Sequence, residues 1–525
     1  MIRIDRARWL RAASARPADA FGLALALASI AIYAWTVFIL PQVRDNGFVC
    51  ERSSVAAAVS NAVWGARPGA LYRGVLDQLL QTLDKPLETV LDELPRSGPP
   101  PARPNDRHPL MRATEDGNGA GFPLVATVAF RLFGIHAWAL PLTTVGLMAL
   151  AAAAFLGRFS SAMAGVVALY FGALTLMLFT SLVWSPLAAQ TPVGGIRYFS
   201  LVAILPTFHL LLEFADPERP AWRTRRRRYR LLGAQAAILA VAIIVRGSAV
   251  PVMGALGLVW LVLAWRRRRD RALFPLLLRK AEVSIAVGLG LLGIMFVVVP
   301  SDYHTQGRFG TVIWHRVTLS FGANPAWPFP GVNDMFDCKK YVPEGIQSGM
   351  PDSNGHCMWL DYVEKNGKWL DPTYNNLTYA APYEAVLRGV FFEIARRYPA
   401  ETAATFFYWK PRLILPALQG AAELDFSHYS ALAVSSFVAA LAIFLAVPVF
   451  LAGIPASGLR SLAGIAALSA GFTLPAYIAV WAMPHTVADL LLDCVLLTGL
   501  GLCGVSLAAR AALRAGTSPP LGTTS

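Results

Sequence analysis

Long apolar runs alternate with polar segments along the whole chain, and their length predicts transmembrane helices. An α-helix needs about 20 apolar residues to cross about 30 Å of hydrocarbon. Runs that approach or reach this length lie at 21–40, 138–156, 162–184, 194–214, 231–245, 249–265, 285–300, 430–451, 462–483 and 487–508. The pattern predicts an all-α polytopic membrane protein with about ten transmembrane helices.

The first run is expected to be a retained span. It follows a basic amino end and closes in Phe38-Ile39-Leu40-Pro41, which lacks the small residues of a signal-peptide cleavage site. The fifth and sixth runs are short and are separated by Arg246-Gly247-Ser248, so they form either a tight hairpin or a broken helix.

Two polar segments are too long to be simple connections, and both are predicted to be periplasmic. The two segments divide the chain into three parts. Residues 1–300 contain spans one to seven and the first loop, which is 41–121. Residues 301–429 form a smaller mixed α/β region, and residues 430–525 contain spans eight to ten and a cytoplasmic tail. The sequence predicts helices at 53–64, 71–94 and 383–398, and the apolar stretch 122–133 is expected to enter the membrane interface. Lys365-Asn366-Gly367-Lys368 is typical of a hairpin turn between 359–363 and 369–370.

Composition agrees with a membrane protein, since 55% of the 525 residues are hydrophobic, only 15% are charged and the mean hydropathy is +0.49. The formal charge of +14 comes largely from Arg runs at 225–228 and 266–269, beside apolar segments. This placement indicates cytoplasmic loops and contact with anionic membrane lipids, not nucleic-acid binding. It predicts a multi-pass protein of the bacterial inner membrane with both chain ends in the cytoplasm.

Cys338 and Cys357 both lie in the second outer region, where an oxidising periplasm would allow a disulfide. The alternative is a metal site that includes His356, for which a fourth ligand at suitable spacing is missing.

Acidic residues flank the first loop. Asp45 follows the first span by a few residues, and Asp116 precedes three glycines at 117, 119 and 121 that allow close backbone approach to a ligand. A carboxylate at the membrane surface can take a proton from an acceptor hydroxyl, so both are candidate catalytic residues. The alternatives are an interfacial carboxylate at Asp45 and a helix-capping turn at Asp116.

Basic residues near the outer ends of the spans are candidates for phosphate or substrate binding. Arg246 interrupts an apolar stretch, where a charge is costly and usually marks a function or a specific partner. A guanidinium can bind a phosphate through two parallel hydrogen bonds. The other candidates are Arg197, His315, Lys410 and Arg412. For each of them the alternative is an interfacial anchor.

These features together resemble the GT-C superfamily of polytopic membrane glycosyltransferases, which use polyprenyl-phosphate-linked sugars. The resemblance is carried by the long first loop with an acid near its start, by Gly121-Phe122-Pro123-Leu124 with Arg131-Leu132-Phe133-Gly134, and by short segments such as Trp314-His315 and Tyr383-Glu384. It implies that Asp45 is the catalytic base. Many members carry a paired acidic motif where this chain has Asp45-Asn46, so the resemblance leaves the use of a divalent metal open, and no metal ligands are predicted.

The resulting hypothesis is an enzyme of the GT-C type that transfers a sugar from a polyprenyl-phosphate donor to a periplasmic or lipid-linked glycan acceptor. The alternatives are a transporter or flippase for a lipid-linked glycan and a non-catalytic membrane protein of envelope assembly. Transporters usually place polar groups near the bilayer midplane and are often built from repeats. The predicted spans have few central charges and show no repeat, which favours chemistry at the membrane surface.

Overall fold

The computed structural model of the chain describes fourteen continuous segments and a few isolated positions. The segments are 17–40, 52–65, 70–72, 87–94, 110–112, 121–159, 163–179, 193–216, 222–246, 250–298, 313–349, 351–366, 381–413 and 430–451. The predicted spans 462–483 and 487–508 lie outside this part of the chain, apart from isolated positions.

Apolar helices dominate the described residues, as expected for a helical membrane protein. Four segments are long and apolar enough to cross a membrane: Ala20–Ile39, Ala139–Phe159, Arg225–Val245 and Phe274–Val298. They belong to α2 (Pro17–Ile39), α8 (Ala139–Phe159), α13 (Trp222–Val245) and α15 (Phe274–Val298), and further apolar helices are α9 (Ala164–Met177), α14 (Val250–Arg267) and α24 (Ala431–Leu451).

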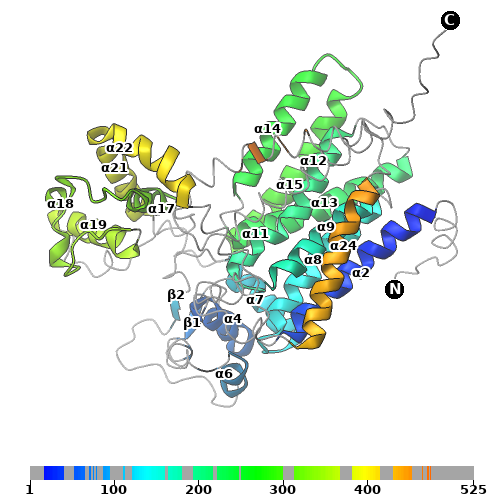
Figure 1. The fold of residues 1–525 in the computed structure, drawn as a ribbon, viewed down its shortest axis with the longest axis horizontal. Helices are drawn as coiled ribbons and strands as arrows, with labels where there is room; N and C mark the ends of the chain where they lie inside the picture. Colours follow the sequence, from blue (N-terminus) through cyan, green and yellow to red (C-terminus); the bar gives the residue numbers. More distant parts are fainter. Residues whose placement is uncertain are drawn as a thin grey trace, which may run out of the picture.

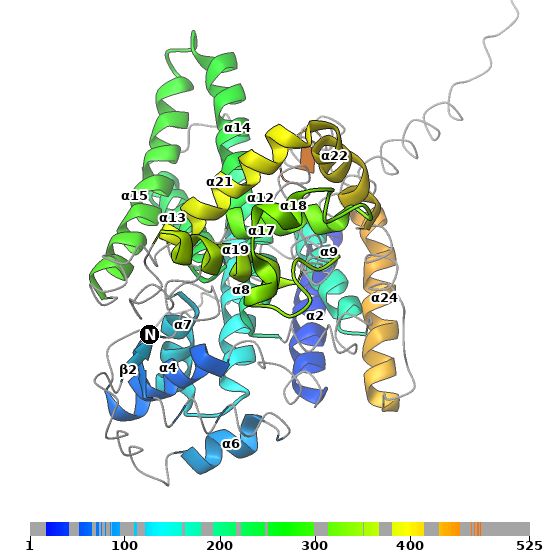
Figure 2. The same ribbon diagram turned by 90° about the vertical axis from the view of Figure 1, so that its left-hand side faces the viewer.

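These helices form one bundle around a continuous apolar core (Figure 1). α2 packs against α9 and α24, while α13 packs against α8 and α15. Figure 2 shows α14 and α15 running side by side, with the turn that joins them at the far end from α4 and α6. The Arg-rich segment 266–269 lies at this turn, and the Arg-rich segment 225–228 lies near the start of α13. We call this side of the bundle the basic end.

Several predicted spans have different bounds in the structure; the span predicted at 285–300, for example, is part of α15, which begins at Phe274. The segment 194–214 is divided into η4 (Ile196–Tyr198), α11 (Phe199–Val202) and α12 (Ile204–Ala215). The predicted span 231–245 is only part of α13, which begins at Trp222 and includes the Arg run. Arginine has a high helix propensity, so the charges mark where the helix leaves the apolar layer and not where it ends.

The first loop contains both helices and a small sheet. The helix predicted at 53–64 is confirmed as α4 (Arg52–Trp64), and the apolar stretch that follows the loop is helical, as α7 (Gly121–Phe133). α4 packs against α7, where Arg131 Nη2 donates to Asn61 Oδ1 at 2.9 Å.

The helix predicted over 71–94 is wrong at its start, residues 71 and 72, whereas the described positions Val75 and Leu79 are helical. β1 (Ala70–Tyr72) pairs antiparallel with β2 (Leu110–Arg112), with Leu71 opposite Met111. The end of this segment is helical, as α6 (Leu87–Glu93). The leucine spacing therefore identified α6 but could not show that Leu71 pairs with a strand far along the chain.

Residues of the second outer region gather in a separate body, which we call the outer body and which lies to the left of the bundle in Figure 1. Its described parts are 313–349, 351–366 and 381–413, and their regular secondary structure is helical, with no strand among them. Its elements are α17 (Trp314–Leu319), η6 (Ser320–Ala323), α18 (Val332–Met335), η7 (Cys338–Lys340), α19 (Asp352–Lys365), α21 (Ala381–Arg397), α22 (Pro399–Ala404) and η8 (Thr405–Trp409).

The outer body has its own aromatic core, distinct from that of the bundle. Phe321 stacks on Trp327 and on Phe391, each with ring centroids 5.4 Å apart. Aromatic pairs of this kind bury large apolar areas and so allow a small body to hold a fixed shape. The helix predicted over 383–398 is confirmed as α21.

The predicted hairpin around Lys365 is wrong, because α19 continues to that residue. Cys357, Asp361 and the neighbouring Met358 are buried at helical spacing. Asn-Gly pairs are typical of hairpin turns, but an Asn is also common just after a helix, and Asn366 is the residue that follows α19.

Buried charges join five helices at the basic end of the bundle. Glu213 and Asp216 lie at the end of α12, and Arg158 of α8 binds both carboxylates. Lys280 Nζ of α15 lies 3.0 Å from Glu213 Oε2, and Arg228 of α13 binds Asp216. Arg267 of α14 completes the group by donating to the carbonyl oxygens of Phe214 and Ala215 at 3.1 and 2.6 Å.

Glu213 is only 1% exposed and Lys280 4% exposed, so neither charge is well screened by water. Removing one partner of such a buried pair leaves the other charge uncompensated. We expect Glu213→Gln to lower the free energy of unfolding by about 3–5 kcal/mol, as measured by equilibrium unfolding in detergent micelles.

Glu393→Gln is the matched control for this experiment. Glu393 pairs with Arg396 and Arg397 on the exposed surface of α21, where water screens the interaction. Its unfolding midpoint should stay close to that of the wild type. Equal effects of the two substitutions would contradict a special role for the buried charges.

Candidate functional site

The start of α7 meets the end of α13 at the side of the bundle opposite the basic end. A Cβ atom at Gly121 would lie 2.2 Å from the carbonyl oxygen of Ile244, so only glycine allows this contact. Arg246 directly follows α13, its backbone N–H donates to Ala242 O at 2.8 Å, and it is 5% exposed. A buried guanidinium therefore lies close to the start of α7.

The segment that begins with Gly194 reaches the same place. Gly194 has a φ of +92°, and a Cβ atom there would lie 2.6 Å from the carbonyl carbon of Leu140. Phe199, which follows η4, packs edge-to-face on Phe122 of α7 at 6.4 Å. This contact places η4 beside the start of α7.

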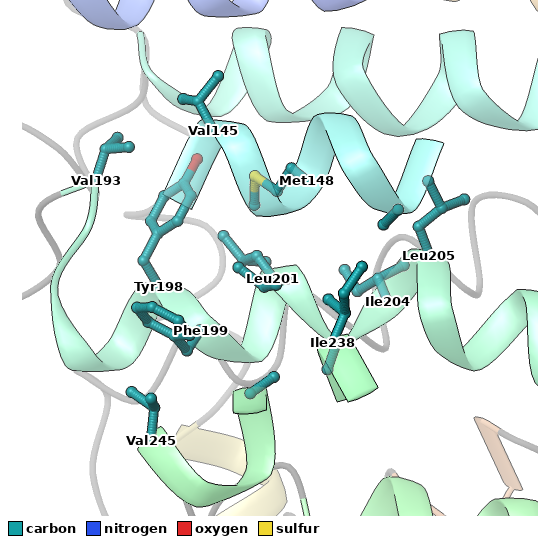
Figure 3. Packing of buried hydrophobic residues seen from close by; sticks show 14 of the residues in the cluster. Val145, Met148, Val193, Tyr198, Phe199, Leu201, Ile204, Leu205, Ile238 and Val245 are labelled. Atoms are coloured by element: carbon teal, nitrogen blue, oxygen red, sulfur yellow. The ribbon is translucent and has the colours of Figure 1, made fainter. Parts of the chain in front are cut away.

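Figure 3 shows how η4 and α11 are held between two spans. The side chains of Tyr198, Phe199 and Leu201 lie between Met148 of α8 and Val245 of α13. Arg197 belongs to η4, but its side chain lies outside the described residues.

Buried tyrosines connect η4 and α11 to the first and third spans. Tyr33 OH of α2 lies 2.7 Å from Tyr198 OH, and Tyr170 OH of α9 donates to Leu201 O at 2.8 Å. These hydroxyls find partners inside an apolar core, where an unpaired polar group would be costly. The carboxy-terminal half of α2 is thereby fixed against η4.

These contacts bring the start of α7, η4 and the end of α13 together. Arg246 follows α13 and Arg197 lies in η4. Asp45 follows α2 and Asp116 precedes α7, but both acids lie outside the described residues, so their catalytic roles stay predictions.

His315 lies instead in the outer body, where it is 4% exposed. Its Nδ1 atom lies 2.5 Å from Tyr383 OH, and its Nε2 atom lies 3.2 Å from Asp352 Oδ1. The hydrogen bond to His315 lowers the pKa of the Asp352 carboxyl. Glu384 caps the helix that carries His315, accepting from the backbone N–H groups of Trp314 and His315 at 2.7 and 3.0 Å.

Lys410 and Arg412 also lie in the outer body. Lys410 is 2% exposed, donates to Ser320 Oγ at 2.9 Å and lies over the Phe406 ring at 4.8 Å. Burial lowers the pKa of Lys410 well below its usual range. Arg412 Nη1 donates to Tyr408 OH at 2.6 Å on the surface. Phosphate or substrate binding by either residue stays a prediction.

A disulfide joins Cys338 and Cys357, the pair named from the sequence, with Cα atoms 5.2 Å apart. It connects η7 to α19 inside the core of the outer body. The opposite side of α19 approaches His315 closely, because a Cβ atom at Gly355 would lie 2.8 Å from His315 Nδ1. The disulfide thus fixes α19, the helix that also contacts His315 and Tyr383.

An open cavity of about 770 Å³ lies between α18, α19 and α21. Its walls combine aromatic and sulfur-containing side chains with carboxylates that sequence reasoning did not identify. They include Trp359, Tyr362, Met335, Asp334, Asp361 and Glu393. Its volume is in the range that accommodates small organic ligands. No local motif marks these residues, because three separate helices supply them.

No family model matches the chain, and no curated protein matches it. Among solved structures it is similar to ArnT from Cupriavidus metallidurans bound to undecaprenyl phosphate, with 14% identity, 94% of this chain and 78% of that chain covered, and a TM-score of 0.32. ArnT in the apo state gives 15% identity, coverage of 95% and 79%, and a TM-score of 0.29. At these TM-scores the likeness carries no argument for the fold or function of this chain.

The outer body is expected to lose stability on mild acidification because of His356. Burial lowers the pKa of His356, and the nearby His315 lowers it further while Asp352 acts in the opposite direction. Below the ordinary histidine value of about 6.5, the unfolded chain then binds a proton that the folded state does not. Stability should therefore fall as the pH falls through this range.

Unfolding midpoints measured between about pH 7.5 and about pH 5 test this expectation. His356→Gln should give a flatter dependence than the wild type, since glutamine does not titrate. A variant that keeps the wild-type slope would contradict the assignment to His356.

Proposed function

We propose that the chain is a membrane glycosyltransferase that transfers a sugar from a polyprenyl-phosphate donor to a periplasmic or lipid-linked glycan acceptor. The observation that carries this proposal is the buried Arg246 at the meeting point of α7 and α13. A fixed guanidinium at the outer end of a bundle suits a lipid phosphate, because the lipid tail can stay in the bilayer while the phosphate reaches the protein.

In the proposed reaction, an acceptor hydroxyl attacks the anomeric carbon while the bond from that carbon to the phosphate oxygen breaks. Asp45, or Asp116 in its place, takes the hydroxyl proton. The polyprenyl phosphate leaves with increased negative charge, so Arg246 and Arg197 stabilise the transition state more than the bound donor.

The contacts around η4 support this assignment through preorganisation. The Gly121–Ile244 approach and the Phe122–Phe199 contact hold the start of α7 against the segments that carry both arginines. Charged groups held in place before the reaction stabilise a developing charge without further rearrangement.

The acceptor half of the site is assigned to the outer body. Its cavity offers the ring of Tyr362, which is 38% exposed, beside carboxylates that accept hydrogen bonds from hydroxyl groups. With the basic end in the cytoplasm, as the positive-inside rule predicts, the opposite end and the site would face the periplasm.

The test is sugar transfer by the full-length protein in nanodiscs, using a panel of polyprenyl-phosphate sugars. Arg246→Gln should reduce the transfer rate by roughly 10²-fold or more, since it removes a donor to the leaving group. Arg246→Lys should retain intermediate activity, because it keeps the charge without the bidentate geometry.

Two further variants make the result specific. Arg230→Gln changes an exposed arginine near the opposite end of the same helix and should keep wild-type activity. Asp45→Asn should block transfer but leave binding of polyprenyl phosphate unchanged, because it removes only the base. Full transfer by a folded Arg246→Gln protein would contradict the proposed phosphate site.

A further inference from the structure

Three side chains of types that bind metal ions meet where α6 of the first loop lies beside the connection between α7 and α8. Glu88 and Asp92 belong to α6, and His136 lies in the connection between α7 and α8. His136 Nδ1 is 3.2 Å from Glu88 Oε1 and 3.8 Å from Asp92 Oδ1, and one ligand atom of each residue lies within 4.8 Å of the other two.

Local structure holds the two carboxylates on one side of α6. Their spacing of four residues places them on the same helical face. Leu87, Val90 and Leu91 are fully buried in the core of the bundle and fix α6 from its other side. The carboxylates are therefore presented together by a helix whose position is already determined.

Local contacts also fix the position of His136. Gly134, with a φ of +86°, lets the chain turn sharply after α7, and the His136 ring stacks on Trp138 at 5.3 Å with an interplanar angle of 10°. Ala137 N donates to Glu88 Oε2 at 2.6 Å, while Glu88 Oε1 faces the imidazole. One oxygen of Glu88 thus anchors the carboxylate and the other remains directed toward His136.

The two separations measured from His136 Nδ1, 3.2 Å and 3.8 Å, lie on either side of the spacing expected in a tetrahedral metal site. Zinc binds nitrogen and oxygen ligands at about 2.0–2.2 Å, which places neighbouring ligand atoms about 3.3–3.6 Å apart. One imidazole and two carboxylates favour Zn²⁺ over Mg²⁺ or Ca²⁺, which prefer sites made only of oxygen. The side chains are between 35% and 51% exposed, which leaves room for water as a fourth ligand.

We propose that Glu88, Asp92 and His136 bind one zinc ion, which connects α6 to the junction of α7 and α8. Because α7 begins at Gly121 beside Arg246 and ends at Phe133, the metal fixes the far end of the helix whose start lies at the candidate site.

Metal-free full-length protein in nanodiscs, titrated with Zn²⁺, tests this proposal. We expect one bound zinc ion per chain by elemental analysis, together with a higher unfolding midpoint. His136→Gln and Asp92→Asn should each weaken zinc binding at least about tenfold, because each removes a ligand. Removing a residue that only hydrogen-bonds to a metal ligand already weakens metal binding by about that factor. Glu93→Gln removes a neighbouring acid of α6 outside the cluster and should bind zinc as the wild type does.

Cobalt substitution gives a second readout that does not depend on activity or on total metal content. Co²⁺ bound to the wild type should give the visible absorption of a tetrahedral site, which His136→Gln should lose. Equal zinc affinity in the wild type, His136→Gln and Asp92→Asn would overturn the proposal. Its failure would leave the proposed phosphate site at Arg246 untouched, because the two sites share no residue.

Discussion

The buried ionic group around Glu213 and Asp216 is the interaction on which the arrangement of the bundle depends. Arg158, Arg228 and Lys280 reach these two carboxylates from three different helices. Each charge is costly to bury alone, so the helices that carry them are stable only in positions that bring the charges together. The basic end is thereby fixed by charge pairing, whereas most of the remaining contacts between the spans are apolar.

The opposite end is fixed by close backbone approach and by paired tyrosines instead. Gly121 against Ile244 and Gly194 against Leu140 admit no larger side chain, and Tyr33 pairs with Tyr198 inside the core. A bundle that is constrained at both ends holds Arg246 in a defined place. This is the arrangement that a phosphate-binding site requires if it is to be formed before the lipid arrives.

Sequence patterns predicted the elements whose signals are local. The apolar runs identified α2, α8 and α15, and helical spacing identified α4 and α21. The alternation of spans and the Arg runs predicted that Arg246 lies at the end of the bundle away from the Arg runs, where the structure has it. They did not predict its proximity to the start of α7, because that contact depends on how two helices far apart in the sequence pack.

Long-range pairing also explains the errors and the omissions. Ala70–Tyr72 is a strand only because Leu110–Arg112 lies beside it, and three residues carry no recognisable strand pattern. Glu88 and Asp92 have the spacing of a shared helical face, but nothing in the sequence places His136 next to them. Glu213 and Lys280 likewise appear in the sequence as isolated charges near the ends of apolar runs.

The most direct test of the central claim is an experimental structure of the full-length protein in nanodiscs with polyprenyl phosphate bound. The account predicts that the phosphate lies at the end of the bundle opposite Glu213, within hydrogen-bonding distance of the Arg246 guanidinium and near the start of α7. A phosphate bound at the basic end, or one that lies far from Arg246 at the opposite end, would contradict it.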